Sequence, residues 1–229
     1  MEEHPFTWFS LIPGLAHQPN HVVGALLVFL LLLLFALAVR LNLKKTNFPM
    51  VPQSRLHLIA EILVDSLLNF LEGIIGHGAR KFLPLLGAIF LFILVSNLLG
   101  LIPGFLPPTE SFNTNLAAGA FIFLMYNYYG FREHGFKYVK QFLGPVLPLA
   151  PLMLIIELVS HAFRPFSLAL RLTGNIFGDH LVFSIFSSLI SVLIPVIFLA
   201  LGLAVSIIQA FVFTLLSTVY ISLAISHEH

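Results

Sequence analysis

Uninterrupted apolar runs of about 18 residues or more recur along this 229-residue chain. A helix rises about 1.5 Å per residue, so such a run is long enough to cross the roughly 30 Å hydrocarbon layer of a bilayer. Charged residues make up only 9% of the chain, against roughly a quarter in soluble domains, so a cytosolic enzyme is close to excluded. A transmembrane β-barrel would show shorter segments of alternating polarity. We therefore predict an all-α, multi-span membrane protein.

The order of apolar and polar segments predicts a single polytopic membrane domain over residues 1–229, with about five membrane-crossing helices and one amphipathic surface helix. The first of the two last helices would be about 60 Å long, twice the bilayer thickness, so both are expected to be strongly tilted. Pro151, Pro165, Gly174 and Pro195 could each mark a kink or a turn there. The expected segments are an outside tail (1–20), spans at 21–39, 82–102 and 115–130, the surface helix (54–77), and long tilted helices at 145–190 and 195–225.

The placement of basic residues predicts the orientation of the chain. Arg40, Lys44 and Lys45 follow the first span directly, which places its end in the cytoplasm and the N-terminus outside. Nine of the eleven Lys and Arg residues fit this topology, and the exceptions are Arg164 and Arg171. Neither a signal peptide nor an organelle presequence is recognisable at the start, which is typical of a protein of the bacterial plasma (inner) membrane. The C-terminus is expected in the cytoplasm.

Polar residues form stripes on three of the expected helices. On the surface helix, His57, Glu61, Asp65, Asn69 and Glu72 are spaced for one face, which we expect to meet water or another protein. In the first long helix, six residues fall within roughly 40° of one line at ~100° per residue: Glu157, His161, Arg164, Arg171, Asn175 and Asp179. The last helix has a similar face, formed by Gly202, Ser206, Gln209, Ser217 and Tyr220. Polar groups inside a membrane commonly mark ion or proton pathways.

Arg171 is the sharpest of these features. An Arg near the middle of a span costs ~2.5–3.5 kcal/mol on insertion scales, and it cannot deprotonate to escape that cost. Two interpretations remain open. The guanidinium pairs internally with Glu157 or Asp179, or it is a fixed cation that faces a mobile carboxylate on a partner. Arg164 in turn either snorkels or binds Glu157 across two turns, and His161 is either a helix-packing residue or part of a pathway.

Several functional classes compete at this point. A secondary transporter with broken helices would show repeated halves, and a membrane enzyme would show a nucleophile and base on one face. Neither signal is present, and a purely structural scaffold would not need Arg171. The chain has no Cys and no phosphate-binding glycine loop, so we expect no cofactor, no metal and no nucleic-acid partner.

Four sequence stretches resemble subunit a of the F-type ATP synthase. The most specific is LALRLTGNIFGDH at 168–180, followed by IIQAFVFTLLSTVYIS at 207–222, with NLLGLIPG at 97–104 and FNTNLAAGA at 112–120 as further support. The resemblance extends over nearly the whole chain from about residue 20. It implies a non-catalytic stator subunit that offers two aqueous half-channels to carboxylates on a rotating ring of c subunits. The implied partners are the c ring, the b-type peripheral stalk, the remainder of the ATP synthase and the lipid bilayer, with H⁺, or less commonly Na⁺, as the translocated ion.

The resemblance also implies roles for individual residues. Arg171 matches the essential arginine beside the ring, Gln209 the glutamine opposite it, and Asn175 the asparagine one turn beyond it. Ser206 shares the face of Gln209. Glu157 matches a polar residue of the cytoplasmic half-channel, with His161 near it.

The outward half-channel departs from the family pattern. Family members that have His at the position of His180 commonly have Glu at position 202, on the last helix. In this chain residue 202 is Gly. Asp179, His180 and Glu110 are therefore the candidates for its protonatable group.

Overall fold

A computed structural model describes residues 19–45, 54–76, 78–102, 105–135, 138, 150–187 and 193–226. All regular secondary structure within these ranges is helical. Almost all of the expected tail at 1–20 lies outside the described residues, as do Lys137, Lys140 and part of the expected junction near 190–195. The elements are α1 (Asn20–Lys45), α2 (Arg55–Ile75), η2 (Ala79–Lys81), α3 (Leu83–Leu99), η3 (Pro108–Glu110), α4 (Phe112–His134), α6 (Ala150–Ser187) and α7 (Leu193–Ile225).

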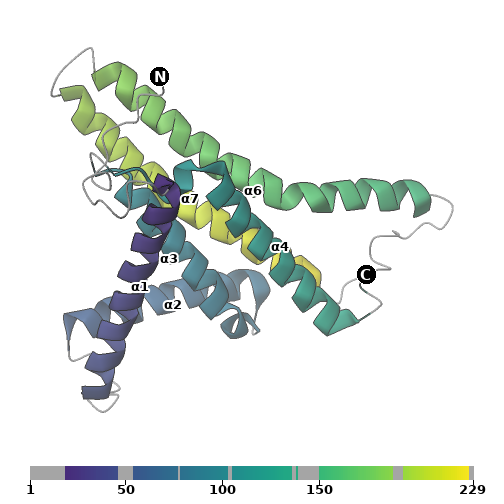
Figure 1. Ribbon diagram of the computed structural model, residues 1–229. Coiled ribbons are helices and arrows are strands. Elements are labelled where there is room, and N and C mark those ends of the chain that lie inside the picture. The colour runs from purple at the N-terminus through teal and green to yellow at the C-terminus, as the bar shows by residue number, and fades with distance from the viewer. Residues whose placement is uncertain are drawn as a thin grey trace.

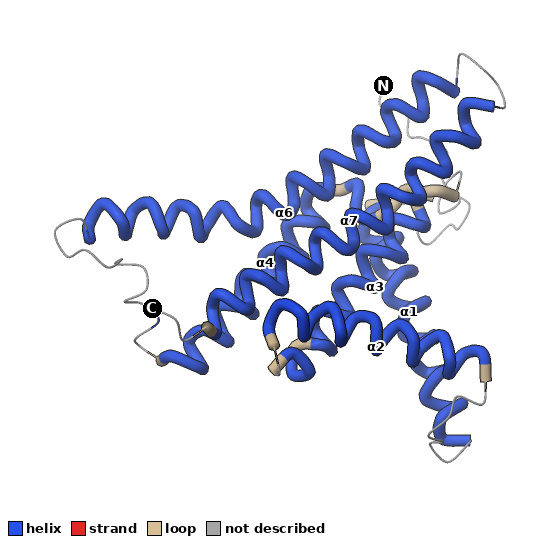
Figure 2. Tube along the Cα trace, turned by 180° about the vertical axis from the view of Figure 1, so that it is seen from behind, coloured by secondary structure: helices blue, strands red, loops and turns tan. Residues whose placement is uncertain are grey.

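The helices form a bundle from which one half of α6 projects. The second half of α6 and the first half of α7 lie side by side and antiparallel, whereas the first half of α6 swings away from the other helices (Figure 1). α4 packs against α6, α3 packs against α7, and α2 lies across the lower part of the bundle (Figure 2). This arrangement leaves one long side of α6 without a packing partner among the described residues.

The lengths and compositions of the helices fit a membrane protein. Within the described ranges, three helical stretches, at 20–44, 152–186 and 196–225, are long and apolar enough to cross a membrane. α3 is shorter, with 17 residues, which corresponds to about 25 Å of helix. Large apolar side chains are exposed along α1 and α6, including Phe29, Leu34, Ile155 and Phe163. Exposure of so much apolar surface to water is unfavourable, whereas contact with lipid chains is not.

α2 begins and ends at clear capping residues. The Ser54 hydroxyl accepts a hydrogen bond from the backbone N–H of His57 at 3.2 Å, which satisfies one of the free donors of the first turn. Gly76 ends the helix with φ +80°, a conformation that side chains other than glycine rarely adopt. Leu67 and Leu71 are buried on one face of α2, while Asp65 is exposed on another.

α6 is one continuous helix of 38 residues with Pro165 in its interior. Of the candidate kinks and turns named above, Pro165 is thus compatible with an unbroken helix, and the helix changes direction near its middle (Figure 1). Proline has no N–H to donate and its ring crowds the preceding turn, which explains such a bend. Gly119 of α4 packs against this point, where an added Cβ would lie 2.7 Å from the carbonyl oxygen of Pro165.

α4 is longer than the span expected at 115–130. It continues through the aromatic group that the sequence places at an interface and ends at Gly135, where φ is +56°. Gly130, within the aromatic group, keeps helical geometry, so the helix continues to Gly135. One of them, Tyr126, is almost fully buried and packs in the core with Ile122 and Phe213.

Candidate functional site

The polar faces of α6 and α7 meet near the middle of the two helices. Asn175 of α6 donates a hydrogen bond from Nδ2 to Oε1 of Gln209 on α7, at 2.7 Å. Gln209 is only 4% exposed, and its Nε2 has no hydrogen-bond partner among the described residues. The polar faces of α6 and α7 therefore lie against each other at this level, which helical spacing alone does not predict.

A cavity of about 440 Å³ opens between α6 and α7 beside this hydrogen bond. Gly174 and Gly178 line it, and an added Cβ on either would meet no atom within 4 Å, so the space beside them is open. Asn175, Asp179 and Gln209 supply its polar groups. A space of this size with three polar side chains is large enough and polar enough to hold water.

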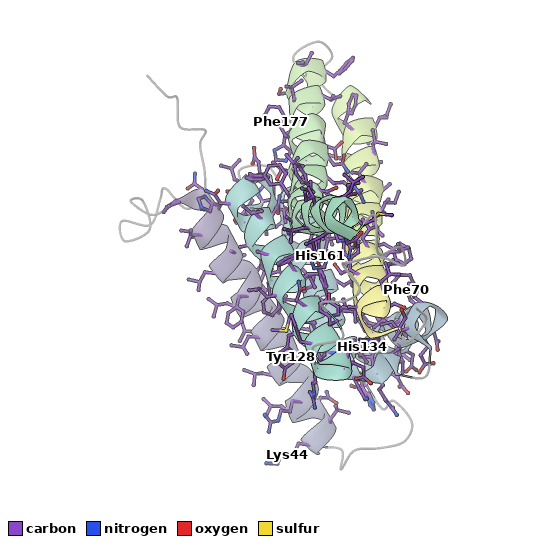
Figure 3. The ribbon with its side chains drawn as sticks, turned by 90° about the vertical axis from the view of Figure 1, so that its right-hand side faces the viewer. Lys44, Phe70, Tyr128, His134, His161 and Phe177 are labelled. Carbon is purple, nitrogen blue, oxygen red and sulfur yellow. The ribbon has the colours of Figure 1, made fainter. Side chains whose placement is uncertain are left out.

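Arg171 lies one turn before Asn175 and is exposed. Among the described residues, no hydrogen bond or ion pair to its guanidinium is found. The neighbouring side chains Leu170 and Phe177 are also exposed, and Phe177 lies on the upper half of α6 (Figure 3). An unpaired cation on an apolar surface is costly in a membrane. The structure shows no pairing of Arg171 with Glu157 or Asp179, both of which are described residues.

Arg164 contrasts with Arg171 on the same helix. Its guanidinium forms an ion pair with Glu157 at 3.6 Å, as the spacing of two turns suggests. It also lies over the rings of Tyr220 and Tyr126, at 5.2 Å and 6.0 Å from their centroids. The charge of Arg164 is thus satisfied within its own chain.

His161 lies at the centre of the bundle, where α6 meets α4 (Figure 3). It is 6% exposed, and its Nε2 lies 2.9 Å from Oδ1 of Asn127 and 3.2 Å from the Tyr126 hydroxyl. The Tyr138 hydroxyl donates to the same Asn127 oxygen at 3.3 Å, and burial raises the pKa of Tyr138, which keeps it a donor. These contacts favour the helix-packing interpretation of His161.

His180 has an acidic neighbour from a distant part of the chain. Its Nδ1 lies 3.6 Å from Oε1 of Glu110, which is the last residue of η3. Asp179 precedes it on α6 and lines the cavity. The structure thus brings together the three candidates that the sequence offers for an outward protonatable group. On α7, Gly202 is buried and packs against Leu101, whose Cδ2 would lie 2.9 Å from an added Cβ.

A buried network of polar side chains lies near η3, and the helical spacing of the sequence does not predict it. Thr109 donates from Oγ1 to Oδ1 of Asn97 at 2.8 Å, and Asn97 donates from Nδ2 to the backbone oxygen of Ser206 at 3.4 Å. Asn115 donates to the backbone oxygen of Thr109 and to Oγ1 of Thr173. Asn97 and Asn115 lie in stretches that carry the family resemblance, and that was the only available hint of their importance.

Comparison with known proteins decides between the candidate classes. The family described as ATP synthase A chain matches residues 22–222. ATP synthase subunit a of Bdellovibrio bacteriovorus is 42% identical over 227 residues, which cover 98% of this chain and 99% of that protein. The chain belongs to the ATP synthase subunit a family. Members of this family are the proton-translocating stator subunit of F-type ATP synthases.

Further relatives agree along nearly the full length. ATP synthase subunit a of Geotalea uraniireducens is 39% identical, with 99% of both proteins covered. ATP synthase subunit a 1 of Syntrophotalea carbinolica is 44% identical, over 99% of this chain and 95% of that protein. For a subunit a, the exposed Arg171, one turn before the Asn175 that lines the cavity, is the arrangement that most needs a functional account.

Proposed function

We propose that this chain provides two aqueous half-channels to the carboxylates of a c-subunit ring and so couples ion flow to rotation and ATP synthesis. The observation that carries the proposal is the exposed guanidinium of Arg171, for which the described residues supply no counter-charge. The chain itself performs no bond chemistry on ATP. Its partners are the c ring, which supplies the mobile carboxylates, and the b-type peripheral stalk, which holds it stationary.

Arg171 separates the two half-channels in this mechanism. A cation within ~4–6 Å lowers the pKa of a carboxylate by ~1–3 units, which corresponds to ~1.4–4 kcal/mol. One charge that moves through 100 mV gains ~2.3 kcal/mol. The effect of the arginine is therefore large enough to release a proton from the ring and small enough for the driving force to reverse it. The same positive charge repels a proton that would pass directly from one half-channel to the other.

The residues around Arg171 divide into two groups along α6. Glu157 and Ser160 lie toward its first half, and these residues belong to the cytoplasmic half-channel. Asp179 and His180 lie toward its other end and belong to the outward half-channel. Asn175, Gln209 and Ser206 lie between the two groups, where the hydrogen bond between Asn175 and Gln209 holds α6 against α7. The cavity beside that bond gives water access close to Arg171.

The chain sits in a bacterial inner membrane with its N-terminus outside and its C-terminus in the cytoplasm. This orientation follows from the basic residues after α1 and after α4. Five crossings, by α1, α3, α4, α6 and α7, satisfy it, and α2 lies along the cytoplasmic surface. The translocated ion is H⁺ in preference to Na⁺.

Replacement of Arg171 in the assembled ATP synthase tests the proposal. In inverted membrane vesicles, Arg171→Ala should abolish ATP-driven proton pumping, because nothing then forces the ring carboxylate to release its proton. Glu133→Gln, which alters an exposed charge at the end of α4, is the matched control and should pump like the parent enzyme. Coupled ATP synthesis at the parental rate in Arg171→Ala would remove the proposal.

A further inference from the structure

The outward half-channel needs a titratable group, and the last helix cannot supply a carboxylate or an imidazole. α7 contains no Asp, Glu, His, Lys or Arg along its whole length, Leu193–Ile225. Gly202 has no side chain and is packed against Leu101. A proton that crosses this region must therefore use groups carried by other elements. On α6 these are Asp179 and His180, and the group that faces His180 from outside α6 is Glu110.

Glu110 is brought to His180 by a short element that is firmly fixed. The preceding residue, Thr109, is 1% exposed, as is Asn115. Through Asn97 and Asn115, hydrogen bonds tie Thr109 to α3, α4, α6 and α7. The bonds join residues as far as 109 positions apart. A loop held by so many elements cannot shift without breaking buried hydrogen bonds, which is costly.

Glu110 itself is less enclosed than its anchors. Its side chain is 32% exposed and that of His180 is 34% exposed, so both can reach water while they face each other. Side chains that serve only to anchor a loop are buried, like Thr109. A carboxylate and an imidazole that face each other at 3.6 Å and are both partly exposed can instead exchange protons, because the ordinary pKa of His lies near neutral pH.

We propose that Glu110 is a proton-exchange carboxylate of the outward half-channel, acting with His180, and that Asn97, Thr109 and Asn115 are positioning residues that hold it there. The inference rests on the proposed function. A proton from the outside binds a Glu110 oxygen and passes to Nδ1 of His180. The imidazolium so formed releases its other proton, from Nε2, to water. Glu110 is left as the carboxylate and His180 as the neutral imidazole, so one proton has moved inward.

Passive proton flux through the assembled membrane sector, stripped of its soluble catalytic part, tests the proposal. Flux is driven by an imposed membrane potential and normalised to the amount of the chain in the membrane. Glu110→Gln should lower the flux about 100-fold or more, because positioned acid–base groups contribute about 10²–10⁴-fold to proton transfer. Glu110→Asp keeps a carboxylate and should retain most of the flux. Glu133→Gln, the control at the far end of α4, should match the parent.

Swapping the two side chains tests whether Glu110 and His180 exchange protons or only form a structural ion pair. In the double variant Glu110→His with His180→Glu, flux should recover to within a few-fold of the parent. Parental flux in Glu110→Gln would overturn the inference. It would also be overturned by a Glu110→Asp variant as inactive as Glu110→Gln, or by an exchanged variant that fails to recover, since either result assigns Glu110 a packing role.

The positioning residues have their own readout. Thr109→Val removes the hydroxyl that donates to Asn97 but keeps the shape of the side chain, and it should lower flux, whereas Thr109→Ser should restore it. Equal flux in the Val and Ser variants would overturn the positioning role.

Arg171→Ala in the same membranes distinguishes a failure of the proposed function from a failure of the Glu110 assignment. Coupled pumping in that variant overturns the proposed function. Its loss, together with parental flux in Glu110→Gln, overturns only the assignment of Glu110.

Discussion

The side-chain amide of Asn175 donates a hydrogen bond to Oε1 of Gln209 across 2.7 Å, one turn beyond Arg171. Asn175 is exposed, whereas Gln209 is buried. The bond therefore connects the outer surface of α6 to the interior of α7 next to the unpaired arginine. It fixes the rotation of α6 about its own axis, and with it the direction in which Arg171 points.

Loss of this hydrogen bond should destabilise the subunit. Asn175→Ala leaves the buried Gln209 oxygen without its partner, and an unsatisfied buried polar group costs about 1–3 kcal/mol. The double variant Asn175→Ala with Gln209→Leu replaces both partners by apolar groups and should recover part of that loss. Thermal unfolding of the purified complexes measures both effects. A single variant as stable as the parent, or a double variant whose losses simply add, would contradict this role.

The two arginines of α6 should respond differently to the same change. Arg164→Gln should retain coupled proton pumping, because the Arg164 charge is satisfied by Glu157 and two tyrosine rings. Its cost should be in stability, about 1 kcal/mol, since partly exposed ion pairs and cation–π contacts are each worth about that or less. Arg171→Gln should instead abolish pumping with little change in stability. ATP-driven pumping and thermal unfolding should be measured on both variants. A loss of pumping in Arg164→Gln, or normal pumping in Arg171→Gln, would contradict this distinction.

Glu157→Gln should reduce proton flux only partly. The carboxylate is 45% exposed, so water and the neighbouring Ser160 can still relay protons when it is replaced. His161→Gln should mainly affect stability, because His161 is held between Asn127 and Tyr126. Passive flux through the membrane sector is the measurement for both. Parental flux in every variant at position 157 would place the cytoplasmic half-channel elsewhere, and a large loss of flux in His161→Gln would contradict the packing role of His161.

The close approach of α4 and α6 should depend on Gly119. In Gly119→Ala the new Cβ would lie 2.7 Å from the Pro165 carbonyl oxygen, so the helices must separate. Overpacking of this kind costs about 1–3 kcal/mol. Gly73→Ala on α2 is the matched control, because its Cβ would meet nothing within 4 Å, and alanine there favours the helix. Thermal unfolding of the purified subunit in detergent should fall for Gly119→Ala alone, and equal midpoints would contradict the steric argument.

Features that depend on local spacing could be predicted from the sequence. The polar face of α6 follows from its period of about 100° per residue, and the pairing of Arg164 with Glu157 follows from a separation of two turns on one helix. The start of α2 at Ser54 lies where the surface helix is expected to begin. The sequence could not decide whether Pro165 breaks or bends the helix, because proline permits either and the packing of Gly119 lies 46 positions earlier in the chain.

Features that depend on distant contacts could not be predicted. The contact of Glu110 with His180, and the bonds of Asn97 and Asn115, join residues that no periodic pattern relates. The sequence supplied Glu110 as one of three candidates, and only the fold singles it out as the partner of His180. The aromatic residues of α4 predict a membrane interface near residue 130, but they do not predict where the helix itself ends, which is at Gly135, where φ is +56°.

The most direct test is the distance from the Arg171 guanidinium to the nearest carboxylate of a partner, measured in an experimental structure of the assembled membrane sector. The account predicts a ring carboxylate within about 6 Å, close enough to shift its protonation. A guanidinium that contacts only lipid, or that pairs with an acidic residue of its own chain, would contradict it.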